Sequence, residues 1–270
     1  MKLSGAIKLL SEAGIDSAAH DARELFEKIG GFSRLQLMGA DPECDSEALA
    51  AALSRRALRE PLQYIVGTVG FYREEYRVDS RCLIPRADTE LLVDYAVKNI
   101  PAGARFLDIC TGSGCVAISV LRNTENTSAV MLDISEGALE LAAENAALMG
   151  VADRAELICA DAMKTVADGE FFAVLSNPPY VAEAVYRGLE REIFHEPKIA
   201  FVGGESGCEF YEKLVPMYKG KISKNGFIAF EIGYDQADKL RAIAEAEGME
   251  CEILRDLGEN SRVAVLKACR

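Results

Sequence analysis

Short apolar runs alternate with helical patterns along most of the chain, and this alternation limits the folds that the chain can adopt. Each run has about the length of a buried strand, and the segment after it has the spacing of a helix. Strands that alternate with helices form βαβ units, which build a mostly parallel sheet covered by helices. The sequence therefore predicts an α/β domain from Asp88 onward, with strands at 105–109, 129–133, 155–159, 172–176, 227–232 and 263–268 and a further one near 250–255.

The residues before this domain have two other patterns. Residues 1 to about 60 predict a small helical domain, whose second helix ends at Gly30-Gly31 and whose third is capped by Asp45 or Ser46 and ends at Pro61. Short strand-like runs joined by turns follow, and they predict a hairpin that links two domains. These runs are Tyr64–Val66, Gly70–Tyr72 and Tyr76–Val78. The predicted divisions are a helical docking domain at 1–62, a β-hairpin linker at 63–85 and the α/β domain at 86–270.

Composition restricts the partners that we expect. The formal net charge of -13 argues against a broad nucleic-acid surface, which would need many lysines and arginines. Seven arginines nevertheless gather between Arg55 and Arg86 beside only four acids, either as a solvated face or as a docking patch. The longest apolar runs fall far short of the roughly 20 residues of a membrane span. Scattered cysteines without a CxxC pattern predict reduced thiols, a cytoplasmic protein and no metal site.

A loop of small residues follows the first predicted strand of the α/β domain. It reads Cys110-Thr111-Gly112-Ser113-Gly114 and leads into a helix, so its backbone can approach a ligand at the helix N-terminus. A tight structural turn has the same pattern, and the glycine spacing also suits dinucleotide cofactors. The carboxylate just before the loop, that of Asp108, would repel a pyrophosphate and favour a ligand with ammonium and sulfonium charges. S-adenosylmethionine is such a ligand, whereas NAD is not.

Two further aspartates follow the next two predicted strands. Asp133 can accept hydrogen bonds from two ribose hydroxyls, or it can cap the helix that starts near Ser135. Asp161 suits the exocyclic amine of adenine with Ala162 against the ring, and a surface turn is the alternative. The predicted cofactor-binding residues are Asp108, Cys110, Thr111, Gly112, Ser113, Gly114, Asp133, Asp161, Ala162 and Asn177.

The tetrad Asn177-Pro178-Pro179-Tyr180 ends the fourth predicted strand. Two prolines stop a strand and donate no N–H, so nearby carbonyl groups stay free to accept hydrogen bonds. An amide oxygen, carbonyls and an aromatic face together can hold a planar NH2 group, although a proline turn with a packed tyrosine is the alternative. The carboxyl ends of parallel strands open onto one crevice, which places this rim beside the glycine loop. We expect Asn177, Pro178 and Tyr180 to be catalytic and to bind substrate together with Pro179.

At nearly full length the chain resembles the peptide-chain release factor glutamine methyltransferases of the PrmC/HemK type. The shared motifs are Arg59–Ile65, Leu83–Glu90, Asp108–Cys115, Asp133–Ser135, Ser176–Tyr180, Glu196-Pro197 with Gly203-Gly204, and Glu231–Gly233. The resemblance implies a Rossmann-like, seven-stranded, mostly parallel methyltransferase domain with a small N-terminal helical domain. Two departures are visible, because Cys110 occupies a position that is often Gly and Ala162 one that can be aromatic.

The resemblance also implies a substrate and a reaction. A methyl group would pass from S-adenosyl-L-methionine, leaving S-adenosyl-L-homocysteine, to the side-chain nitrogen of the glutamine in the Gly-Gly-Gln motif of class 1 release factors. The same NH2 clamp suits adenine N6 or cytosine N4, so a DNA or RNA amino-methyltransferase is the main alternative. A nicotinamide-dependent dehydrogenase and a non-catalytic module that docks on a translation factor are weaker alternatives.

Overall fold

The computed structural model describes residues 1–269, and these pack into two compact units. Unit 1 combines Met1–Thr68 with the distant segment Glu190–His195, and unit 2 contains Val69–Leu189 and the chain from Glu196 onward. The three-part division proposed from the sequence, with a linker at 63–85, stays a prediction. Within residues 1–269, no helix is both long enough and apolar enough to cross a membrane.

Unit 1 is helical, as the sequence predicts. Its elements are α1 (Leu3–Glu12), α2 (Ala18–Lys28), α3 (Arg34–Leu37), α4 (Glu47–Ala57), α5 (Leu62–Val66) and the 3-10 helix η3 (Arg191–His195). Leu3 and Leu10 of α1 point into a core that includes Leu25 of α2 and Leu53 of α4. The side chain of Ser46 caps α4 by accepting from the Leu49 backbone N–H at 3.3 Å, which decides between the two predicted caps.

The prediction of a strand at Tyr64–Val66 is wrong, because these residues belong to the helix α5. Pro61 stands at the helix N-cap, and Gly67 ends the helix with a φ of 83°. Leu62 and Ile65 are three positions apart, so one helical turn directs both into the core of unit 1, whereas a strand would direct them to opposite faces. Burial of this pair therefore overrides the β-propensity of the segment.

The arginine-rich region contains several arginines that are paired with acids inside their own units. Arg55 pairs with Glu60 in unit 1, and in unit 2 Arg77 pairs with Glu144, Arg81 with Asp79 and Arg86 with Glu196. This pairing favours the interpretation as an ion-paired face over that of a docking patch. Arg56 of this arginine-rich region is buried. Its Nε lies 2.7 Å from Asp21 Oδ2, and its Nη1 lies 3.4 Å from Glu192 Oε1.

We predict that Asp21→Asn destabilises unit 1 by about 3 kcal/mol, since removing one partner of a buried ion pair leaves the other charge inadequately compensated. Hydrogen exchange measured by mass spectrometry should show faster exchange of peptides from α2 and α4. Asp16→Asn, at an exposed position, is the matched control and should change neither the stability of unit 1 nor the exchange of these peptides. Identical exchange in the two variants would show that the Arg56 pair contributes little.

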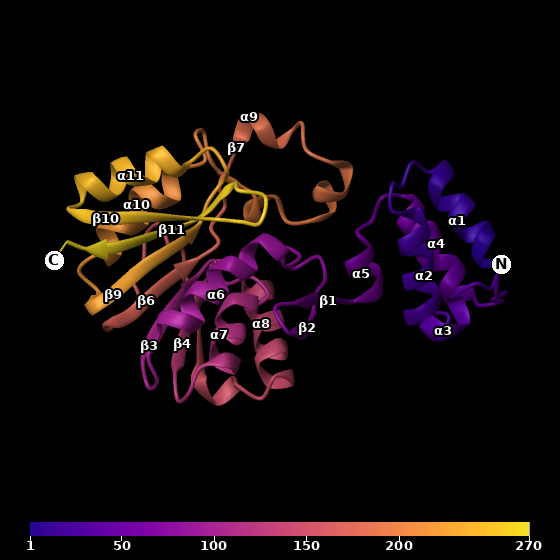
Figure 1. Ribbon diagram of the computed structural model, residues 1–270, viewed down its shortest axis with the longest axis horizontal. Coiled ribbons are helices and arrows are strands. Elements are labelled where there is room, and N and C mark those ends of the chain that lie inside the picture. Colours follow the sequence, from indigo (N-terminus) through magenta and orange to yellow (C-terminus); the bar gives the residue numbers. More distant parts are fainter. Residues whose placement is uncertain (270) are drawn as a thin grey trace. The chain divides into compact units, whose positions relative to one another are not determined.

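Unit 2 is built on a seven-stranded sheet with the order β10-β11-β9-β6-β3-β4-β5 (Figure 1). The sheet strands are β3 (Arg105–Ile109), β4 (Ser128–Asp133), β5 (Ala155–Cys159), β6 (Phe171–Ser176), β9 (Ile222–Glu231), β10 (Met249–Arg255) and β11 (Ser261–Ala268). Neighbours from β9 to β5 run parallel, and β11 pairs antiparallel with both β9 and β10. The predicted strands and the mostly parallel sheet are confirmed.

Helices cover both faces of this sheet (Figure 1). The helices of unit 2 are η1 (Ala87–Thr89), α6 (Glu90–Asn99), α7 (Cys115–Asn123), α8 (Glu136–Leu148), η2 (Ala152–Arg154), α9 (Glu183–Tyr186), η4 (Lys198–Ala200), α10 (Glu209–Tyr218) and α11 (Ala237–Ala246), of which α9 and η4 lie against a small separate pair of strands instead. Successive residues of β3 alternate between the two faces, so Phe106 packs with α6 and α7 while Leu107 packs with α10 and α11.

Two small strand pairs complete unit 2. The predicted hairpin consists of β1 (Thr68–Phe71) and β2 (Glu74–Arg77), and β7 (Val181–Ala182) pairs in parallel with β8 (Val202–Gly204). The second pair brings glycines against the tetrad backbone. A Cβ on Gly203 would stand 2.2 Å from the Pro179 carbonyl oxygen, and one on Gly207 would stand 2.3 Å from that of Tyr180. These glycines thus hold the end of the tetrad by close backbone packing.

Candidate active site

A cavity of unit 2 lies at the carboxyl ends of β3, β4, β5 and β6. Most of the predicted site residues line it, namely Cys110, Thr111, Gly112, Ser113, Asp133, Asp161, Ala162, Asn177 and Pro179. Apolar side chains that include Leu83, Pro85, Ile199 and Phe210 complete the wall. Asp108, Gly114, Pro178 and Tyr180 are not among the lining residues, although each is adjacent in sequence to a lining residue or to the end of its strand. The order of motifs along the chain therefore predicts one shared crevice correctly.

The glycine loop turns sharply between β3 and α7. Cys110, Gly112 and Gly114 have φ values of 59°, 55° and 81°, a region that disfavours residues with a Cβ. Gly114 is also confined sterically, because a Cβ there would stand 2.7 Å from the Met131 Cε. Cys110 therefore adopts a glycine-like conformation, and burial raises the pKa of its thiol well above the ordinary value.

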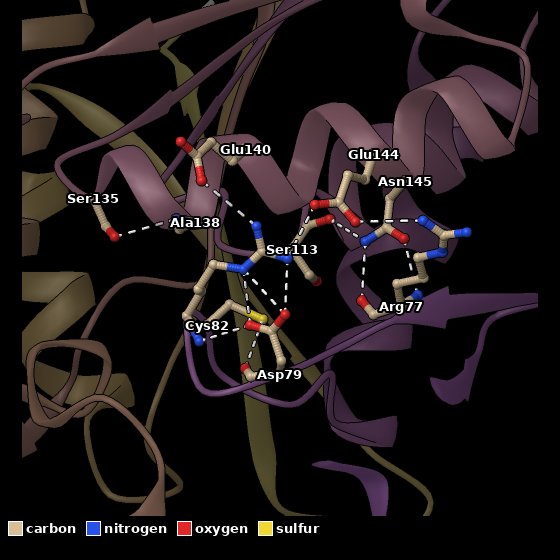
Figure 2. Close-up of polar contacts among 10 residues, drawn as sticks. Arg77, Asp79, Cys82, Ser113, Ser135, Ala138, Glu140, Glu144 and Asn145 are labelled. Atoms are coloured by element: carbon tan, nitrogen blue, oxygen red, sulfur yellow. Dashed lines mark hydrogen bonds and ion pairs between the residues drawn. The ribbon is translucent and has the colours of Figure 1, made fainter. Parts of the chain in front are cut away.

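Asn145 of α8 fastens this loop to the hairpin (Figure 2). Its Nδ2 donates to the carbonyl oxygens of Ser113 at 2.9 Å and of Arg77 at 3.1 Å, and its Oδ1 accepts from the Arg77 N–H at 2.9 Å. The side chain is fully buried, so these partners satisfy groups that water cannot reach. Nearby, Arg81 bridges Asp79 and Glu144 beside the same loop.

Asp108 lies beneath the loop, with only 1% of its surface exposed. Its Oδ2 accepts from the Thr111 hydroxyl at 2.6 Å and from the Ala117 N–H at 3.2 Å, at the start of α7. Burial raises the pKa of this carboxyl to about 7, although the two hydrogen bonds act in the opposite direction. A cation bound above the loop would therefore favour the ionised form.

Asp133 does not cap α8. The cap is Ser135, whose Oγ accepts from the Ala138 N–H at 3.2 Å. Asp133 instead accepts from the N–H groups of Gly112 and Ser135, both at 2.9 Å, and burial raises its pKa. Each carboxylate oxygen has a second lone pair, so Asp133 can still accept from hydroxyls in the cavity.

Asp161 forms the predicted turn and also lines the cavity, whereas its contact with adenine stays a prediction. In the turn its Oδ1 accepts from the Met163 N–H at 2.9 Å. The Lys164 ammonium, 2.8 Å from Oδ2, lowers the pKa of this carboxyl. An ionised acceptor therefore stands at the cavity wall next to Ala162.

The tetrad ends β6 at the opposite side of the cavity from β4. Asn177 lines the cavity, and its Nδ2 donates to the Thr89 hydroxyl at 3.2 Å. The Tyr180 hydroxyl donates to Glu231 Oε1 at 3.1 Å. Burial and this carboxylate together raise the pKa of Tyr180, which keeps the phenol protonated.

Three of these residues carry no role in the sequence interpretation. Thr89 and Glu231 occur there only within shared motifs, and Asn145 is an unremarked helix residue. One signal was available for Glu231, because a carboxylate that ends a parallel strand belongs to the same edge as Asp108 and Asp133. Asn145 and Thr89 gain their partners only through tertiary contacts.

This fold and site define a class. A seven-stranded sheet of this order, with a small-residue loop after its central strand and carboxylates after the next two, is that of the Rossmann-like S-adenosylmethionine-dependent methyltransferases. The Methyltransferase small domain model matches residues 86–203. The crystal structure of a ribosomal protein methylase from Lactobacillus delbrueckii shares the fold with a TM-score of 0.51, at 20% identity over 68% of this chain and 81% of that one.

The chain belongs to the family of release factor glutamine methyltransferases. The PrmC N-terminal domain model matches residues 3–67. The release factor glutamine methyltransferase of Caulobacter vibrioides is 36% identical over 95% of this chain and 91% of its own length. The release factor glutamine methyltransferase of Geobacter sulfurreducens is 34% identical over 94% of this chain and 91% of its own length. Both domains of the family are therefore represented, and the resemblance inferred from the motifs is confirmed.

We predict that Asn145→Ala destabilises unit 2 by about 3 kcal/mol. The substitution removes the hydrogen-bond partner of the buried Ser113 carbonyl and of both the N–H and the carbonyl of Arg77. Urea unfolding followed by circular dichroism measures the change. Glu140→Ala, on an exposed position of α8, is the control and should stay within about 0.5 kcal/mol of the parent. A loss no larger than that of the control would contradict the fastening role.

Proposed function

We propose that this enzyme transfers a methyl group from S-adenosyl-L-methionine to the side-chain amide nitrogen of the glutamine in the Gly-Gly-Gln motif of class 1 release factors. Family membership over nearly the full chain supports the assignment. The observation that carries the chemistry is the position of Asn177 on the wall of the same cavity that Asp133 and Asp161 line.

The residues of the cavity fit S-adenosyl-L-methionine, which supplies an electrophilic methyl group on a sulfonium. Asp133 offers free lone pairs for ribose hydroxyls, and ionised Asp161 can accept from the adenine amine beside Ala162. The backbone of the loop from Cys110 to Ser113 lines the cavity and would approach the ligand, and Asp108 beneath it would supply negative charge toward the cationic end.

An amide nitrogen is a poor nucleophile because its lone pair is delocalised into the carbonyl group. Positioning must therefore supply much of the catalysis. The Asn177 Oδ1 and the Pro178 carbonyl would each accept one hydrogen of the substrate NH2, which orients the nitrogen and stabilises positive charge that develops on it. Tyr180, with Pro179 beside it, would present a ring face to the planar amide.

Asn177→Ala is expected to lower kcat by at least a hundredfold, since the variant loses an acceptor aimed at the developing charge. Cofactor affinity, measured by calorimetry, should change by less than threefold because the other cavity residues remain. Thr165→Val, an exposed substitution outside the site, is the control and should alter neither value. Affinity and rate lost together would contradict this division of roles.

The substrate assignment is tested with tritiated S-adenosylmethionine. Label should appear on a class 1 release factor, and changing the glutamine of its Gly-Gly-Gln motif to alanine should abolish the labelling. Double-stranded and single-stranded DNA and RNA, assayed in parallel, should stay unlabelled. Label on a nucleic acid, or on the altered release factor, would overturn the assignment.

The raised pKa of Asp108 gives a linkage prediction. At pH 6 this carboxyl is mostly protonated, because its pKa is about 7. A bound cation lowers that pKa, so cofactor binding at pH 6 should release close to one proton. Calorimetry in buffers of different ionisation enthalpy measures the release, which should be much smaller in Asp108→Asn. Equal proton release in the two proteins would mean that Asp108 does not sense the cofactor's charge.

A further inference from the structure

Glu231 is a buried carboxyl beside the tetrad, and the proposed transfer assigns it no role. It ends β9 and is 1% exposed. Because β6 and β9 pair in parallel with Ser176 opposite Phe230, Glu231 occupies the strand end next to Asn177. Its Oε1 accepts from the Tyr180 hydroxyl, and its Oε2 has no hydrogen-bond partner within residues 1–269. A buried acceptor of this kind is costly and needs a function.

Thr89 connects Glu231 to the tetrad. Its side chain is buried, its hydroxyl accepts from Asn177 Nδ2 at 3.2 Å, and it lies near enough to Glu231 to lower the pKa of that carboxyl. A hydroxyl has one proton to donate, and an ionised carboxylate can only accept. An ionised Glu231, whose Oε2 has no hydrogen-bond partner within residues 1–269, would draw the Thr89 proton toward itself, and the hydroxyl oxygen would then face Asn177 as an acceptor.

This directionality decides which end of the Asn177 amide faces the cavity. The NH2 end is the only donor of that side chain, so it must point at an accepting Thr89 oxygen. The Oδ1 end is then left for a ligand. With the amide reversed, an NH2 group would face the NH2 group of the substrate, and neither could accept from the other.

We propose that Glu231 is a positioning residue that, through Thr89, fixes the orientation of the Asn177 amide so that the site selects a substrate with an NH2 group. Through the Tyr180 hydroxyl the same carboxylate also holds the ring of the tetrad in place. This inference rests on the proposed function, since it explains how that site discriminates its substrate.

Ionisation of Glu231 supports the argument. Its pKa is raised to about 7, because burial and, to a smaller extent, the Asp88 charge outweigh the opposing effects of Thr89, Tyr180 and Arg262. A protonated Glu231 could donate to Thr89 and so reverse the direction of the chain of hydrogen bonds. Methyl transfer should therefore fall as the pH decreases through about 7, even with the cofactor saturating.

Kinetics of isosteric variants test the proposal. Thr89→Val and Glu231→Gln should lower kcat at least tenfold with less than a threefold change in cofactor affinity. Thr89→Ser retains the hydroxyl and should recover most of the parental rate. Glu231→Gln should also lose the acidic limb of the kcat profile. Glu245→Gln and Thr165→Val are exposed controls and should behave like the parent. Parental kcat and pH profile in Glu231→Gln would overturn the proposal.

Substrate selection gives a second test. A release factor whose Gly-Gly-Gln glutamine is changed to glutamate presents acceptors in place of the NH2 group. The parent should bind it at least tenfold more weakly than the glutamine form, and Glu231→Gln and Thr89→Val should reduce that ratio to below threefold. An unchanged ratio in both variants would contradict the orienting role.

A readout without turnover separates this inference from the proposed function. The side-chain NH2 resonances of Asn177, assigned by their absence in Asn177→Ala, should shift in Thr89→Val and return toward parental positions in Thr89→Ser. No shift in Thr89→Val would overturn the inference even in an active enzyme. If the resonances shift in Thr89→Val as expected but the parent protein does not methylate release factors, the proposed function alone would be overturned.

Discussion

The burial of two carboxyl groups at strand ends is the constraint on which the rest of the site depends. A buried carboxylate is unfavourable unless hydrogen bonds or charges compensate it. Asp108 recruits the Thr111 hydroxyl and the first turn of α7, so the glycine loop must close over it. Glu231 accepts from the Tyr180 hydroxyl, so the tetrad must turn toward β9. The two halves of the site are each organised around one buried acid.

The order of the sheet sets these halves side by side. Strand β6 lies between β3 and β9, so the tetrad emerges from the strand between the two buried acids. Neighbouring strands are separated by about 4.8 Å. A ligand over the end of β3 and a group held at the end of β6 are therefore brought within reach of each other by the backbone alone. Side chains then adjust orientation rather than distance.

Much of this arrangement could be predicted from the sequence. Periodicity located the strands because their side chains are buried on both faces, and polar residues at the strand ends located the crevice. Local pattern failed at Tyr64–Val66, where packing of Leu62 and Ile65 selects a helix. The sequence also could not show that Asp108 lies outside the cavity lining, where it accepts from Thr111 and Ala117. The partnership of Thr89 with Asn177 joins residues 88 positions apart, and no local pattern encodes such a contact.

The NH2 clamp that we propose would not by itself distinguish a glutamine amide from an adenine amine, because both present a planar NH2 group with a delocalised lone pair. Recognition of a particular macromolecule must then come from surfaces outside the cavity. The arginines near the hairpin are a weak candidate for binding phosphates, since several of them are already paired with acids. Unit 1 is the stronger candidate, because it matches the PrmC N-terminal domain, a module separate from the methyltransferase domain that holds the chemistry. Exchanging unit 1 should therefore alter the choice of substrate more than any substitution in the tetrad that preserves activity.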